Sequence, residues 1–199
     1  MYIPEPYAVA DRDALHGVIR ENNFGLLVNQ VEGAPFATHL PFLIEGDVLV
    51  SHMASANPQW RSFAADREVL CIFQGPHAYI SPRWYESSNT VPTWNYVAVH
   101  VHGVPEIIAD PAAALADQVL LVAAHESGFA EPWSLAERDP GMIDGLLRAI
   151  VNFRIPLGRI EGKFKLGQNK TAADRAGDIA ALEESGDPTA RALAALMRT

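Results

Sequence analysis

Apolar and polar positions alternate with a period of two over several stretches of the chain, a pattern typical of half-buried β-strands. The pattern predicts strands over residues 24–30, 35–44, 48–52, 68–74, 78–81 and 150–161. Glu32-Gly33 and Glu45-Gly46-Asp47 supply turns between the first three of these strands. The first part of the chain is therefore expected to form a meander of antiparallel strands.

The clearest strand of the sequence spans residues 93–108. Val97, Val99 and Val101 fall on one of its faces, as expected when that face is buried against a core. Gly103 and Pro105 lie near its end and predict a bend or a bulge there.

Helices are predicted where a capping residue precedes an apolar stripe. They cover residues 11–23, 111–127, 140–150 and 172–186, with a terminal helix after Asp187-Pro188 and short helical starts at Asn57-Pro58 and Ser81-Pro82. The last two helices form a tail over about residues 171–199. Antiparallel strands followed by late helices favour an α+β, mainly β fold, a barrel with peripheral helices, over a doubly wound sheet. No repeat or linker is apparent, so residues 1–199 are expected to form one domain.

Charge and cysteine content limit which partners the protein is expected to bind and in which cellular compartment it is expected to lie. The formal net charge is −9 at pH 7, and an acidic surface repels the phosphate backbone of nucleic acids. The single cysteine, Cys71, excludes an internal disulfide and lies in an apolar run. No basic and apolar leader opens the sequence, and the apolar run over residues 119–124 is too short to span a bilayer. A cytoplasmic protein with no membrane partner is expected.

Common signatures of enzymes and metal sites are missing or incomplete. Residues 162–169 look like a phosphate-binding loop, but Gln168-Asn169 stand where the Lys-Ser/Thr pair belongs. Neither the G-x-G-x-x-G of a dinucleotide-binding domain nor the G-x-S-x-G of an α/β-hydrolase occurs. His100 and His102 share a strand face, with Glu106 nearby, but two histidines do not complete a metal shell. No metal is predicted.

The stretch over residues 152–175 is basic in an otherwise acidic chain. Its cations are Arg154, Arg159, Lys163, Lys165, Lys170 and Arg175. Glycines and the amides Gln168 and Asn169 are interleaved with them and suit close approach and recognition of an anion. The stretch predicts a site for a cofactor phosphate or, as the alternative, for a nucleic-acid backbone.

Five segments carry a resemblance to a known family. They are Thr38–Phe42, Ser51–Trp60, Tyr79–Tyr85, Val91–Gly103 and Gly162–Asn169. Together, and in this order, they resemble the PaiB-like family of FMN-binding negative transcriptional regulators over nearly the whole chain. The resemblance implies a split β-barrel of the kind shared with pyridoxamine-phosphate oxidases and flavin reductases. It also implies a homodimer that holds FMN in a groove between the protomers.

The chemistry of FMN selects the expected contacts within this resemblance. The phosphate needs cationic donors, and the ring needs apolar or aromatic walls with polar groups at its edges. The expected contacts are Thr38, His39, Ser51, His52, Asn57, Trp94, Tyr96, Lys163, Lys165, Gln168 and Asn169. The related oxidases place a lysine near the strand end at Ser51, and this chain lacks it, so Lys163 or Lys165 is expected to supply the charge. The structural alternatives are a helix cap for Asn57, core packing for Thr38 and His39, and packing in the dimer seam for the aromatic side chains.

Three functions are compatible with these residues. The first is a regulator or a redox or metabolite sensor that binds flavin, since no acid–base or nucleophile constellation is evident. The second is an FMN-dependent oxidoreductase of the flavin reductase or pyridoxamine-phosphate oxidase type, with His39, His52 or Tyr96 placing the substrate. The third is haem binding on the same barrel, because seven histidines offer axial ligands. Direct DNA binding has less support, because no basic helix-turn-helix is found and the terminal helices are about as acidic as basic.

Overall fold

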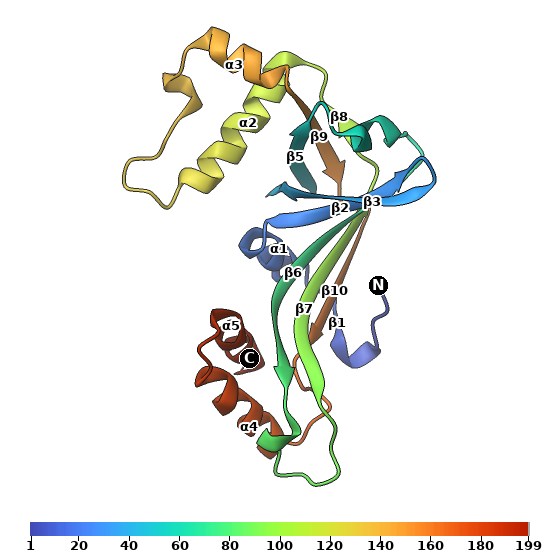
Figure 1. The fold of residues 1–199 in the computed structure, drawn as a ribbon, viewed down its shortest axis with the longest axis vertical. Coiled ribbons are helices and arrows are strands. Elements are labelled where there is room, and N and C mark those ends of the chain that lie inside the picture. Colours follow the sequence, from blue (N-terminus) through green and yellow to red (C-terminus); the bar gives the residue numbers. More distant parts are fainter. Residues whose placement is uncertain (199) are drawn as a thin grey trace. The chain divides into compact units, whose positions relative to one another are not determined.

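The computed structural model describes residues 1–198, which fall into two compact units (Figure 1). The terminal unit combines Met1–Val18, Gln74–Val99 and the chain from Glu161 onward, and the central unit combines Ile19–Phe73 and His100–Ile160. Three long strands contribute residues to both units: β6 (Val69–Ile80), β7 (Thr93–Gly103) and β10 (Arg159–Lys165). The assignment of residues 1–199 to a single domain stays a prediction.

Antiparallel sheets dominate the chain, which confirms the predicted α+β, mainly β class. A six-stranded sheet has the order β1-β10-β7-β6-β2-β3, and a four-stranded sheet has the order β4-β5-β9-β8. The other strands are β1 (Ala8–Val9), β2 (Phe24–Val31), β3 (Ala34–Pro41), β4 (Leu43–Glu45), β5 (Val48–Ala54), β8 (Glu106–Ile107) and β9 (Ile150–Pro156). The predicted alternation in β7 is confirmed, because Val97, Val99 and Val101 are fully buried.

The meander is present, but its second predicted strand divides in two. Strands β2 and β3 form a hairpin, and its turn residues Glu32 and Gly33 both have positive φ, as a two-residue hairpin turn requires. The predicted strand over residues 35–44 ends at Pro41 and resumes as β4. The amide of Phe42 donates instead to the carbonyl of Asn23 at 2.8 Å, so the ladder is interrupted there.

Two other predicted strands are also divided. The strand over residues 150–161 breaks into β9 and β10, since Pro156 has no amide hydrogen and the amide of Leu157 donates to Asp47 at 2.9 Å. The strand over residues 93–108 breaks into β7 and β8 after Gly103. A Cβ atom at Gly103 would lie 2.2 Å from the carbonyl oxygen of Pro156, so only glycine fits this close approach.

The central unit packs helices on its four-stranded sheet. α2 (Pro111–Glu126) and α3 (Pro140–Leu147) lie together, preceded by the caps Asp110 and Asp139 (Figure 1). The buried Asp117 of α2 binds the guanidinium of Arg154 on β9 at 2.6 and 3.0 Å. Two short 3-10 helices, η2 (Pro58–Ser62) and η4 (Leu135–Glu137), complete the unit.

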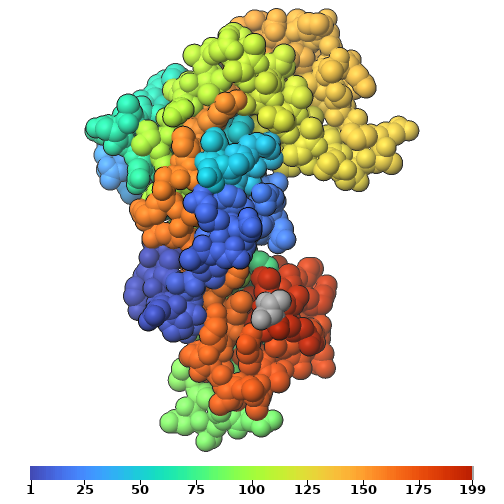
Figure 2. All heavy atoms as spheres, turned by 180° about the vertical axis from the view of Figure 1, so that it is seen from behind, coloured from blue at the N-terminus to red at the C-terminus, as the bar shows by residue number. Residues whose placement is uncertain are grey.

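The terminal unit packs α4 (Ala172–Glu183) and α5 (Pro188–Arg198) as a helical pair, which are the helices predicted for the tail. The hydroxyl of Thr171 accepts the amide of Asp174 at 3.1 Å, so the predicted cap is confirmed. β1 pairs with β10, and Figure 2 shows the first residues, in dark blue, against this orange strand. The 3-10 helices η1 (Glu5–Tyr7) and η3 (Pro82–Trp84) also belong to this unit, and α1 (Arg12–Glu21) contributes residues to both units. Within residues 1–198, none of the helices has the length and apolar character needed to cross a membrane.

Candidate functional site

Two of the predicted contacts of the central unit, Thr38 and Asn57, meet at Gln59, a fully buried side chain at the start of η2. The hydroxyl of Thr38 donates to Oε1 of Gln59 at 2.5 Å, and Nδ2 of Asn57 donates to the same hydroxyl at 3.0 Å. Oδ1 of Asn57 accepts the amide of Gln59 at 2.9 Å and so caps η2. Thr38 and Asn57 are therefore brought together, and both serve a network within the chain.

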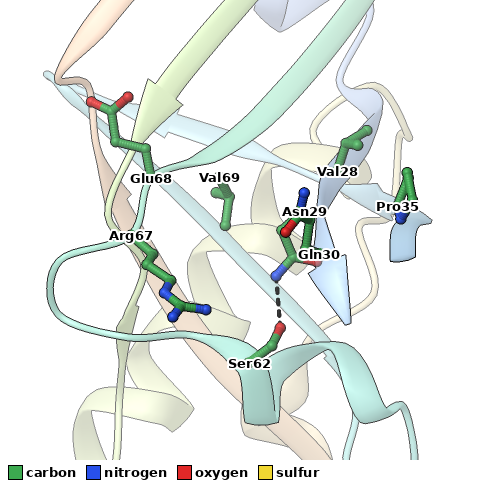
Figure 3. A pocket seen from close by; sticks show the side chains of 8 residues that line it. All are labelled: Val28, Asn29, Gln30, Pro35, Ser62, Arg67, Glu68 and Val69. Atoms are coloured by element: carbon green, nitrogen blue, oxygen red, sulfur yellow. Dashed lines mark hydrogen bonds between the residues drawn. The ribbon is translucent and has the colours of Figure 1, made fainter. Parts of the chain in front are cut away.

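The same network reaches the wall of a pocket of about 550 Å³ (Figure 3). Nε2 of Gln59 donates to Oδ1 of Asn29 at 3.0 Å, and Nδ2 of Asn29 donates to the hydroxyl of Ser62 at 2.8 Å. The lining residues are Val28, Asn29, Gln30, Pro35, Ser62, Arg67, Glu68 and Val69. Apolar walls and an amide and hydroxyl edge suit a planar heterocycle, whereas Arg67 and Glu68 offset each other in charge.

Ser51 and His52 lie on opposite faces of β5. Ser51 is fully buried and donates its hydroxyl to the carbonyl of Pro41 at 2.7 Å. His52 is half-buried opposite Asn152 of β9, and its Nδ1 has no hydrogen-bond partner in the described part of the chain. Burial lowers the pKa of His52 below its ordinary value, which favours the neutral imidazole.

His39 lies on the exposed surface of the β2–β3 hairpin. Its ring stacks on Phe24 with 6.0 Å between the ring centroids and 25° between the planes. Phe24 is 66% exposed, so the pair presents an aromatic surface at the edge strand of the six-stranded sheet. Such a surface suits contact with a flat ring or with a second chain.

The predicted contacts of the terminal unit include a lysine that is already fully engaged. Lys163 is buried, and its Nζ donates to the carbonyl of Tyr2 at 3.1 Å. The same ammonium lies 5.5 Å from the ring centroid of Tyr2 and 5.2 Å from that of Tyr96. Two aromatic faces thus hold this cation inside the unit. Tyr96, also a predicted flavin contact, is one of these two rings and contacts Lys163.

Lys165 and the following amides lie at the end of β10. Nζ of Lys165 donates to the hydroxyl of Thr93 and, at 2.8 Å, to the carbonyl of Trp94. The side chain of Gln168 accepts the amide of Leu166 and donates to the carbonyl of Phe164, so it braces the loop. Asn169 is exposed and lines a small pocket together with Lys165. Trp94 is 54% exposed.

The sequence of this chain is similar to those of proteins with a flavin-binding domain. A family described as "Putative FMN-binding domain" matches residues 1–159. The protein "Protease synthase and sporulation protein PAI 2" of Bacillus subtilis is 37% identical over 201 residues, which cover 99% of this chain and 96% of that protein. The chain belongs to the FMN-binding-domain family. The PaiB-like resemblance is confirmed, and the chain is a flavin-binding protein.

Solved structures give the fold of this family member. The FAD and haem binding protein of Mycobacterium smegmatis matches with a TM-score of 0.62 and 19% identity, covering 88% of this chain and 80% of that one. The flavocytochrome Anf3 of Azotobacter vinelandii matches with a TM-score of 0.62 and 17% identity, covering 85% of this chain and 75% of that one. These matches confirm the split β-barrel fold.

Several residues of the Gln59 network and of the two pockets were not predicted from the sequence. Gln59 lies in the segment Ser51–Trp60. Its position two residues after the cap Asn57 is the signal that could have predicted its role. Asn29, Ser62 and Arg67 come from separate elements, and nothing in their spacing indicates that they share a pocket. Lys170 is one of the cations of the basic stretch, but the sequence did not predict it as a contact of the flavin.

Proposed function

We propose that this protein is a cytoplasmic homodimer that binds FMN and acts as a regulator or a redox or metabolite sensor. The observation that carries the proposal is the FMN-binding-domain match over residues 1–159, together with a relative whose name refers to protease synthesis and sporulation. When bound, the flavin would supply the redox chemistry, and the protein would hold and orient it. Homodimerisation is supported by the exposed Phe24–His39 surface on the edge hairpin.

The pocket of Figure 3 is the proposed place of the isoalloxazine ring. Its volume of about 550 Å³ lies in the range of cofactor pockets. The exposed amide of Gln30 and the second Nδ2 proton of Asn29 offer polar groups for the edge of the ring, and Val28 and Val69 offer apolar walls. Thr38 and Asn57 would act behind this wall by fixing Gln59, which in turn fixes Asn29.

The visible spectrum of the freshly purified protein, and its effect on FMN fluorescence, are the first tests of the proposal. We expect a visible flavin spectrum, or quenching of added FMN fluorescence with one FMN per chain at saturation. A colourless protein that leaves FMN fluorescence unchanged would contradict it. Anaerobic NADH or NADPH then separates sensor from reductase, because bleaching of the bound flavin would assign a reductase and an unchanged spectrum would support the sensor.

A matched pair of variants tests the location. Pro35 lines the pocket, whereas its neighbour Ala34 does not, and both are exposed at the start of β3. Pro35→Trp should abolish FMN binding by filling the pocket, and Ala34→Trp should preserve it because adjacent strand residues face opposite sides. Equal FMN affinity in the two variants would place the ring elsewhere.

A further inference from the structure

All three lysines of this chain lie within eight residues, at positions 163, 165 and 170. They lie beyond residues 1–159, which the FMN-binding domain matches, in a chain whose net charge is −9. Lys163 is not available to bind a ligand, because it is buried between two tyrosine rings. Lys165 and Lys170 are different, because both line a pocket of about 150 Å³ in the terminal unit.

The lining of this pocket is suited to an anion. Its residues are Tyr85, Val91, Pro92, Thr93, Asn95, Lys165, Gly167, Asn169 and Lys170. Among these described lining residues there are two cations and no carboxylate. The exposed amide of Asn169 adds a neutral donor. A tetrahedral oxyanion fits a pocket of this size, whereas a three-ring flavin does not.

The two lysines keep capacity for a ligand. Lys165 uses two of its three ammonium protons on Thr93 and Trp94, which leaves one and fixes its direction. Nζ of Lys170 lies 4.2 Å from the ring centroid of Tyr85, and no carboxylate pairs with it in the described chain. Gly167, at φ 78°, forms a turn in which the amide of Lys170 donates to the Gly167 carbonyl at 3.0 Å.

Two nearby carboxylates, Asp174 and Asp178, are not among the residues that line the pocket. Asp174 accepts the amide and the hydroxyl of Ser87 at 2.9 and 2.7 Å, and the buried Asp178 attracts Lys170 without forming an ion pair with it. Burial, together with the positive charges of Lys163 and Lys170, lowers the pKa of Lys165. An anion bound in the pocket would relieve the repulsion between these lysines.

We infer that Lys165, Lys170 and Asn169 form a binding site for a phosphate dianion in the terminal unit. The phosphate belongs either to FMN or to a separate phosphorylated metabolite. The site does not require flavin binding, since inorganic phosphate alone can occupy it. A failure of the proposed flavin function and a failure of this inference are therefore distinguishable.

Lysine-selective NMR on the full-length protein tests the inference directly. Labelling with ¹³C-lysine gives three ε-methylene resonances, and inorganic phosphate is titrated at constant ionic strength against chloride. We expect saturable shifts of Lys165 and Lys170, a smaller shift of Lys163, and a higher pKa of Lys165 with phosphate bound. Shifts no larger than those caused by chloride would overturn the inference.

Two variants separate binding from general charge. Lys170→Met keeps an apolar stem on Tyr85 and should weaken phosphate binding about tenfold or more, because a charge-assisted contact is lost. Arg83→Met removes one positive charge from an exposed residue of the same unit outside the pocket and should change the affinity less than twofold. An unchanged Lys163 resonance in both variants reports an intact fold. Equal phosphate affinity in the two variants would contradict the site.

Flavin titrations identify the source of the phosphate. If FMN moves the Lys165 and Lys170 resonances and riboflavin does not, the site takes the flavin phosphate. If inorganic phosphate moves them and FMN does not, it takes a separate phosphorylated ligand. Both results support a phosphate site. If neither FMN nor inorganic phosphate moves them, the inference fails even in a protein that binds riboflavin.

Discussion

The polar cluster around Gln59 and the lysine pocket at the end of β10 both contain residues predicted to contact the flavin, but they differ in how many of their hydrogen-bonding groups have partners within the chain. Every polar side-chain atom of Gln59 has a partner within the central unit. Lys165 and Lys170 face a pocket in the terminal unit that contains no carboxylate among the lining residues. Residue type alone therefore does not separate a structural network from a ligand site, whereas unused hydrogen-bonding capacity does.

The largest expected effect comes from breaking the satisfied network. Gln59→Leu leaves Asn29, Thr38 and two backbone carbonyls without their partner, and it should lower the free energy of unfolding by about 3 kcal/mol. Gln30→Leu, at an exposed position of the same unit, should change it by less than about 0.5 kcal/mol. Urea unfolding at pH 7 measures both. Similar stabilities of the two variants would show that the network is not structural.

The two pocket lysines should differ from each other in stability. Lys165→Met removes hydrogen bonds to Thr93 and Trp94 and should cost about 1 to 2 kcal/mol. Lys170→Met should cost about 0.5 kcal/mol or less, because its ammonium contacts the ring of Tyr85 and attracts Asp178 without forming an ion pair. Urea unfolding in phosphate-free buffer measures this. A larger loss for Lys170→Met would mean that its ammonium supports the fold.

A smaller, pH-dependent effect is expected in the terminal unit. Burial raises the pKa of Asp178 from 3.8 to about 6, and its carboxylate has no hydrogen-bond partner within residues 1–198. The folded chain therefore holds a proton that the unfolded chain has lost between pH 4 and 6, so stability falls as the pH rises through this window. Asp178→Asn should flatten this slope in urea unfolding at several pH values. A variant with the slope of the native protein would contradict the assignment.

The smallest effect has the opposite sign and lies in the central unit. Because the pKa of folded His52 is lowered, the unfolded chain binds more protons below about pH 6.5. Stability should therefore fall as the pH drops through this range, and His52→Gln should reduce that loss. Unfolding at pH 5.5 and 7.5 measures the difference, and His39→Gln, at an exposed position, is the control. A loss equal to that of the native protein in His52→Gln would exclude this histidine as its source.

Sequence reasoning predicted the elements better than the junctions between them. Period-two alternation located most strands, and the cap Thr171 located α4. The bend at Gly103 was predicted, but the breaks after Pro41 and Pro156 escaped it, because each depends on a contact with a residue that is distant in the sequence or on a missing amide hydrogen.

The candidate site was predicted as a set of residue types and not as an arrangement. The segments that carry the resemblance contain Thr38, Asn57 and Lys165, but their partners decide their roles. Lys163 became a structural cation because two tyrosines enclose it. Asn29 and Lys170 acquired importance only through the pockets that tertiary structure creates.

Sedimentation velocity with simultaneous detection at 280 and 450 nm tests the proposed FMN-binding dimer most directly. After FMN is added at micromolar concentration, we expect the 450 nm absorbance to sediment with a protein species of twice the chain mass, at one FMN per chain. Flavin absorbance that stays in the slow boundary of free FMN, or a protein that sediments as a monomer, would contradict the proposal.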